Sequence, residues 1–166
     1  MRNQFSFVLA LGLGVFIAGA AGAQSSAAPA AGSSPAAGSA PLATADGEVP
    51  GTQVQVTKLK RTGDSVLLQF TIFNNSDADV GLTNLSTPIE YKAADAVYLA
   101  DLAGKKKYEV VRDTDKKCLC SKGLEKVQAK SSVNLWAKFP APPDSVQKLS
   151  VVIPHYMPID DVPVSQ

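Results

Sequence analysis

The sequence predicts an all-β fold, an antiparallel β-sandwich of about seven strands, and three observations support it. From about residue 52 onward, apolar residues alternate with polar ones, which is the period of a strand with one face in a core. Residues with turn chemistry separate these runs, and turns about every 8–12 residues are typical of two packed sheets. No segment has capped helical spacing of apolar residues; in the one candidate, 90–99, Val97 and Tyr98 favour a strand. A small open barrel is the alternative architecture.

The clearest pair of strands is a hairpin at the start of this region. Val54 and Val56 stand two apart in its first strand, and apolar residues fill alternate positions of 66–72 in its second. Between them, residues 62–65 read Thr-Gly-Asp-Ser, which has turn chemistry. Five weaker strands follow, at residues 97–101, 107–111, 133–139, 147–153 and 162–164. Pro163 lacks a backbone donor, so the last strand can lie only at a sheet edge.

Composition divides the chain into three parts. Residues 1–23 form a secretory signal peptide, with Arg2, an apolar stretch and an Ala-Gly-Ala cleavage site before Gln24. Residues 24–50 are rich in Ala, Ser, Gly and Pro and form a disordered linker, because they cannot bury enough apolar surface to fold. Residues 51–166 form an immunoglobulin-like β-sandwich domain. Its expected core consists of Val54, Val56, Val66, Leu68, Phe70, Ile72, Leu99, Val110, Leu135, Phe139, Leu149, Val151 and Ile153.

Charge and motif content exclude several functions. Without Arg2 the chain has fifteen basic and fifteen acidic side chains, whereas nucleic-acid binders carry a basic excess. No apolar run of about 18 residues follows the signal, so the mature chain has no expected transmembrane segment and should be periplasmic or secreted. We expect neither an enzyme nor a cofactor, because His155 is the single histidine and the sequence has no Gly-x-Ser-x-Gly motif and no glycine-rich phosphate loop.

The two cysteines, Cys118 and Cys120, stand in the segment Lys-Cys-Leu-Cys-Ser. In an oxidising compartment, thiols this close are expected to pair as a structural disulfide. Cα atoms two residues apart in a regular strand lie about 6.6 Å apart, near the upper limit for a bridge, so pairing requires a local kink. A redox-active thiol pair and a metal site stay open as alternatives. In the metal alternative, His155 and Met157 join the cysteines as a soft ligand set for copper or zinc.

Trp136 is a candidate binding residue. It alternates with Leu135 and Ala137 along its expected strand, so its ring can face away from the core. An exposed ring would anchor a binding surface, and a buried ring would be a large core residue. The sequence leaves both possibilities open.

Lys105, Lys106 and Lys107 begin a lysine-rich stretch that extends to residue 130. Such a stretch can be a solvated loop and edge-strand face, where lysine prevents pairing between sheet edges. It can also bind an anionic envelope polymer or anionic lipid headgroups. Acidic residues interspersed among the lysines favour the first interpretation.

Several segments of the last hundred residues form a recognisable series. The most specific are 117–121, Lys-Cys-Leu-Cys-Ser, and 139–143, Phe-Pro-Ala-Pro-Pro; the others are 97–99, 106–108, 111–113, 135–138, 151–154 and 161–163. In this series the chain resembles a group of exported bacterial domains, in which a similar sandwich-like domain is often joined to an OmpA-type, peptidoglycan-binding module. The resemblance implies a sandwich fold and an exported location, and it supplies no catalytic residues.

Together these features favour a non-catalytic binding or adaptor module of the cell envelope. It would contact an envelope protein or a glycan through a sheet face or through the lysine-rich loops. The alternative is a periplasmic metal-binding or thiol-redox protein that uses Cys118, Cys120, His155 and Met157.

Overall fold

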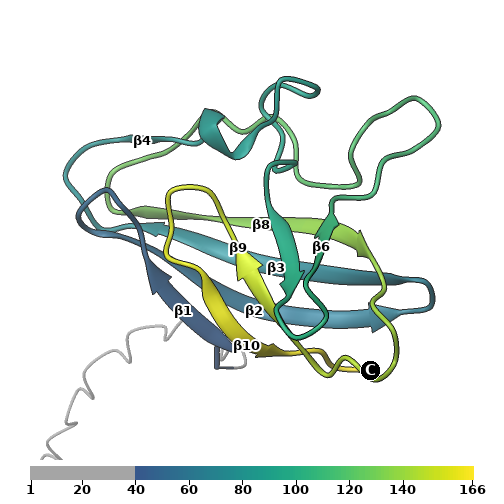
Figure 1. Cartoon of the computed structure of the whole chain (residues 1–166). Helices are drawn as coiled ribbons and strands as arrows, with labels where there is room; N and C mark the ends of the chain where they lie inside the picture. The colour runs from purple at the N-terminus through teal and green to yellow at the C-terminus, as the bar shows by residue number, and fades with distance from the viewer. Residues whose placement is uncertain (1–39) are drawn as a thin grey trace, which may run out of the picture. The chain divides into compact units, whose positions relative to one another are not determined.

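The computed structural model describes residues 40–166. The expected signal peptide, 1–23, and most of the expected linker, 24–50, lie outside the described residues. Residues 40–166 form ten β-strands and one short 3-10 helix, without an α-helix (Figure 1). The elements are β1 (Ala43–Asp46), β2 (Thr52–Thr62), β3 (Ser65–Asn74), β4 (Val80–Gly81), η1 (Thr83–Leu85), β5 (Tyr98–Asp101), β6 (Lys106–Glu109), β7 (Lys126–Val127), β8 (Ser131–Pro140), β9 (Lys148–Val152) and β10 (Ile159–Pro163). The all-β fold class is confirmed, and the seven expected strands correspond to β2, β3, β5, β6, β8, β9 and β10.

The longer sheet has the strand order β1-β2-β3-β8, and all neighbouring strands are antiparallel. β2 and β3 form the expected hairpin. Gly63 in its turn has a φ of 56°, a left-handed conformation that glycine adopts without steric cost. Side chains are buried at alternate positions along most of β2 and β3, so the sheet has one face in the core and one outside it.

The second sheet has the order β10-β9-β5-β6 and is also antiparallel. β5 and β6 form the second expected hairpin, and β10, which contains Pro163, lies at the sheet edge as expected. A separate short pair, β4 and β7, joins two of the longer connections. None of the helical residues within 40–166 forms a segment long and apolar enough to cross a membrane.

The two sheets pack against each other around one core, and the strands of the second sheet cross those of the longer one (Figure 1). Every residue that the sequence places in the core is buried, with Phe70 and Phe139 the largest fully buried side chains. Backbone hydrogen bonds also join the sheets: the N–H of Val111 donates to the carbonyl of Lys138 at 2.8 Å. The arrangement is a β-sandwich. Its order differs from the A-B-E-D sheet of an immunoglobulin constant domain, so the immunoglobulin-like assignment is not confirmed.

The folded domain begins earlier than the sequence indicates. β1 lies inside residues 24–50, the expected disordered linker, and it pairs with β2 from Ala43 to Asp46. The expected boundary at residue 51 is therefore wrong. Ala43 and Ala45 are half-buried against the core. Alanine is depleted in strands and gives no apolar alternation, so the segment carries no strand signal of its own.

Candidate functional site

Trp136 lies on the outer face of β8. Its neighbours Leu135 and Ala137 are buried in the core, whereas Trp136 is 38% exposed. The structure therefore decides the question that the sequence leaves open and places the ring outside the core. In the sheet register Trp136 stands opposite Gln69 of β3.

An open groove runs beside Trp136 on the outer face of the longer sheet. Its volume is about 320 Å³, and it is lined by Thr57, Gln69, Phe70, Thr71, Asn134, Leu135 and Trp136. Thr71 stands opposite Asn134, two residues along the same strands from the pair of Gln69 and Trp136. Thr57 lies at a β-bulge of β2, and bulges change the direction in which a side chain points. No lining residue carries a charge.

The groove presents hydrogen-bonding groups that are partly used within the protein. The Thr71 hydroxyl donates to Asn134 Oδ1 at 2.6 Å, and the Thr57 hydroxyl donates to the backbone carbonyl of Gln69 at 3.1 Å. Within residues 40–166, no hydrogen bond engages the side-chain amide of Gln69, the amide NH₂ of Asn134 or the indole N–H of Trp136. These three groups are available to a ligand.

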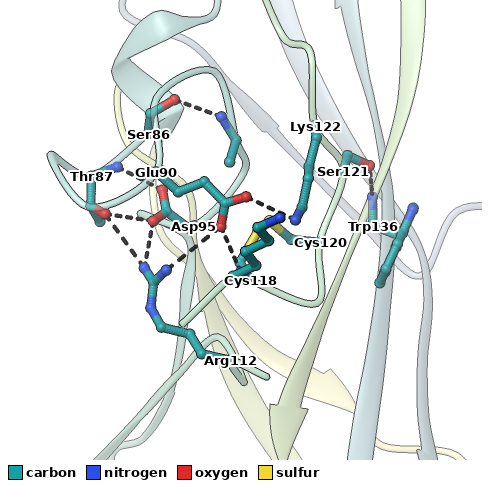
Figure 2. Close-up of a disulfide and its surroundings, with 12 residues drawn as sticks. Ser86, Thr87, Glu90, Asp95, Arg112, Cys118, Cys120, Ser121, Lys122 and Trp136 are labelled. Atoms are coloured by element: carbon teal, nitrogen blue, oxygen red, sulfur yellow. Dashed lines mark hydrogen bonds and ion pairs between the residues drawn. A yellow bond between two sulfur atoms is a disulfide. The ribbon is translucent and has the colours of Figure 1, made fainter. Parts of the chain in front are cut away.

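The edge of β8 beside Trp136 is covered by the segment that contains both cysteines (Figure 2). The N–H of Ser121 donates to the carbonyl of Trp136, and the N–H of Trp136 donates to the Ser121 hydroxyl, both at 2.9 Å. The N–H of Lys138 donates to the carbonyl of Leu119, also at 2.9 Å. The segment therefore prolongs the sheet past β8, protects its edge and holds the backbone of Trp136 in place.

Cys118 and Cys120 form a close pair, with their Cα atoms 5.3 Å apart. This separation is shorter than the roughly 6.6 Å of a regular strand, so the local kink that pairing requires is present. The two residues make isolated bridges to different partners, Arg112 and Ala137. Both side chains are buried in the core.

An ion pair between Asp95 and Arg112 lies next to the cysteine segment (Figure 2). Arg112 Nη2 donates to Asp95 Oδ2 at 2.5 Å, and the backbone N–H of Thr87 donates to Asp95 Oδ1 at 2.6 Å. Asp95 is buried, and a buried carboxylate requires such partners because it has lost its water. The sequence alone does not indicate this pair, since no local motif joins its members.

Glu90 connects the loop before β5 to the cysteine segment. Its carboxylate accepts a hydrogen bond from the backbone N–H of Cys118 at 2.6 Å and pairs with Lys122 Nζ at 2.8 Å (Figure 2). These contacts hold the pKa of Glu90 below its ordinary value of 4.5: the Lys122 hydrogen bond has the largest effect and the Cys118 N–H the next, against the opposing effect of burial. Glu90 therefore stays ionised while it holds the cysteine segment.

Lys105, Lys106 and Lys107 lie at the β5–β6 hairpin of the second sheet. Lys105 occupies the turn with a φ of 52°. Lys106 Nζ lies 5.2 Å from the ring centroid of Tyr108, and Lys107 Nζ lies 4.4 Å from that of Tyr98. The three ammonium groups therefore belong to a different sheet from the groove at Trp136, and two of them lie over aromatic rings of their own hairpin.

The structure does not bring the four residues of the metal alternative together. His155 lies in the loop between β9 and β10, where its Nδ1 is 2.6 Å from the carboxylate of Glu48. Met157 is exposed in the same loop. Cys118 and Cys120 lie instead between the loop after β6 and the edge of β8. Within residues 40–166, no group of three or more His, Cys, Asp and Glu side chains is arranged to hold a metal ion.

Comparison with known proteins returned no relative. The chain matches no protein-family model, no curated protein and no solved structure.

Proposed function

We propose that this protein is an exported, non-catalytic binding or adaptor module of the cell envelope, located in the periplasm or outside the cell. Its recognition surface is the groove beside Trp136. One observation carries the proposal: an exposed tryptophan borders an uncharged groove in which three hydrogen-bonding groups have no partner within residues 40–166. Exposed aromatic rings with nearby polar groups are typical of recognition surfaces.

The position of the groove in the fold favours recognition. β2, β3 and β8 each contribute lining residues, and these strands form the continuous antiparallel part of the longer sheet. A ligand that binds such a surface does not have to order a loop, so less of the interaction energy is lost on binding. The hydrogen bonds between Ser121 and Trp136 hold the anchor residue in the same way.

The chemistry of the groove supports a non-catalytic role. General acid–base catalysis needs a titratable side chain near the reacting group, and nucleophilic catalysis needs an activated nucleophile. The lining residues offer the hydroxyls of Thr57 and Thr71, both engaged as hydrogen-bond donors, and include no acid, base or thiol.

Export and a Cys118–Cys120 disulfide belong to the same proposal. The signal-peptide pattern of residues 1–23, the resemblance to exported domains joined to OmpA-type modules, and the close approach of the cysteines support both. Intact-mass analysis of protein exported by a bacterial host, with thiol alkylation, tests them. We expect the mass of a chain that begins at Gln24, is two hydrogens lighter than its reduced form and carries no alkyl group. The mass of a chain that begins at Met1 contradicts cleavage of the signal peptide, and the mass of an alkylated chain contradicts the disulfide.

The positions of the cysteines do not favour the thiol-redox alternative. Cys118 and Cys120 are both buried, whereas reactive and redox-sensing cysteines are accessible to their partners. The pair fits a structural role, in which it holds the segment that covers the edge of β8.

Sedimentation with insoluble envelope material from a bacterial host tests the binding function. We expect the wild-type protein to sediment with this material and Trp136→Ala to bind at least about tenfold more weakly, because the aromatic anchor is lost. Tyr91→Ala is the matched control, since Tyr91 is exposed on the loop before β5 and lies outside the groove lining. An equal loss of envelope binding in both variants, or no loss of envelope binding in Trp136→Ala, contradicts the proposal.

A further inference from the structure

We infer that the ligand of the groove is an uncharged polysaccharide, with one sugar ring stacked on Trp136 and neighbouring hydroxyls bonded to the polar side chains of the sheet. The inference rests on the proposed function and specifies its ligand class. Three features of the outer face of the longer sheet support it: a continuous polar row, the absence of charge from the groove lining, and the kind of hydrogen-bonding groups that have no partner.

The polar row crosses the whole longer sheet. Thr44 of β1 stands opposite Gln55 of β2, Gln55 opposite Thr71 of β3, and Thr71 opposite Asn134 of β8. Neighbouring strands are about 4.8 Å apart, so this row extends over about 14 Å. Thr71 is 8% exposed and forms the floor of the groove, and Trp136 stands at the β8 end. An extended chain of hydroxyl-bearing rings can lie along such a row.

The charges of this face lie outside the groove lining. Lys58 stands opposite Gln69 and so borders the groove, and Lys60 and Lys138 stand on either side of Leu67, but none of the three lines the groove. An acidic polysaccharide or an acidic peptide would be bound best where cations line the contact surface. The amides and hydroxyls of the groove match instead a ligand that forms hydrogen bonds without carrying a charge.

The unpaired groups suit a polyol better than a protein surface. Amides offer both donors and acceptors, and a sugar hydroxyl can donate to one group and accept from another. The fully buried centre of a protein–protein interface is enriched in apolar and aromatic residues. In this groove Trp136 is the single aromatic ring at the surface, and the lining around it that reaches the surface consists of the exposed Asn134 and the half-buried Thr57 and Gln69.

The protein carries its own reporter for this test, because Trp136 is its only tryptophan. The exported protein is titrated with two uncharged hexasaccharides, a β-1,4-linked glucose hexamer and a β-1,4-linked N-acetylglucosamine hexamer, and with an oligogalacturonate as the acidic counterpart. We expect a saturable change in tryptophan fluorescence, and protection from acrylamide quenching, with at least one uncharged hexamer. No saturable change with either uncharged hexamer, or a change with the oligogalacturonate alone, overturns the inference.

Calorimetric titration of variants with the hexamer that binds identifies the groove as its site. Gln69→Ala and Asn134→Ala are each expected to weaken binding about tenfold, because each removes hydrogen bonds to the sugar. Leu102→Ala, an exposed position outside the groove lining, is the control and should bind as the wild type does. Unchanged affinity in Gln69→Ala and Asn134→Ala, with circular dichroism showing a folded protein, overturns the assignment. If neither hexamer binds while Trp136→Ala still loses envelope binding, the glycan inference fails and the proposed function stands.

Discussion

Asp95 and Arg112, 17 residues apart in the sequence, join two connections of the sandwich. Arg112 Nη2 lies 2.5 Å from Asp95 Oδ2; the carboxylate side chain is fully buried and that of Arg112 is 23% exposed. Asp95 precedes β5 and Arg112 follows β6, so the pair links the two segments that flank the β5–β6 hairpin. Arg112 also donates to the carbonyl of Lys116 at 3.0 Å, which shapes the turn that leads to the cysteines.

Breaking this ion pair should destabilise the protein. Asp95→Asn keeps the shape of the side chain but leaves the mostly buried Arg112 with only the more distant carboxylate of Glu90, whose Oε2 lies 3.7 Å from Arg112 Nη1. We expect the free energy of unfolding to fall by about 2–4 kcal/mol, measured by urea denaturation with circular dichroism. Lys148→Gln is the control, because it breaks an exposed pair with Asp161, and such pairs contribute little. If the free energy of unfolding of Asp95→Asn fell no further than that of the control, the ion pair would contribute little to stability.

The pKa of Glu90 predicts a pH dependence. Hydrogen bonds from Lys122 and from the Cys118 N–H lower this pKa in the folded protein below the ordinary 4.5. A depressed carboxyl pKa contributes stability that is present above the ordinary value and is lost as the pH falls through the folded value. Glu90→Gln should therefore be less stable than the wild type at pH 7, and the difference should shrink as the pH falls below about 4.5. Urea denaturation of both proteins between pH 7 and pH 3 measures this difference in stability. A difference that does not change with pH contradicts the prediction.

The strands were predictable where the signal is local. The alternation of Val66, Leu68 and Phe70 identifies both a strand and its buried face, because a strand places every second side chain on the same side. β1 carries small side chains, and β4 and β7 have two residues each, so they depend on their partners and leave no periodic signal.

The site was predictable only in part. Alternation within β8 gives Trp136 two possible environments, and the second sheet determines which face of β8 is buried. The groove depends on the pairing of Thr71 with Asn134, two residues far apart in the sequence, and on the bulge at Thr57. The ion pair of Asp95 and Arg112 depends in the same way on two loops that meet only in the folded chain.

Reduction of the proposed Cys118–Cys120 bridge should destabilise the protein only modestly. The bridge closes a very short loop, and loop-closure entropy then gives about 1.5 kcal/mol. A phosphine reductant should therefore lower the urea midpoint of the wild type slightly and leave that of Cys118→Ala/Cys120→Ala unchanged. An equal effect of the reductant on both proteins would show that it acts elsewhere, and no effect on the wild type would argue against a bridge.

Trp136 and Phe139 lie on the same strand but on opposite faces, so their substitution should separate binding from stability. Phe139 is fully buried, and Phe139→Ala should lower the free energy of unfolding by about 3–5 kcal/mol, because it leaves a cavity. Trp136→Ala removes a partly exposed ring and should cost about 1–2 kcal/mol. Circular dichroism in urea measures both, since Trp136→Ala has no tryptophan fluorescence. If Trp136→Ala cost as much as Phe139→Ala, the ring would be part of the core, and its loss of envelope binding would report unfolding rather than recognition.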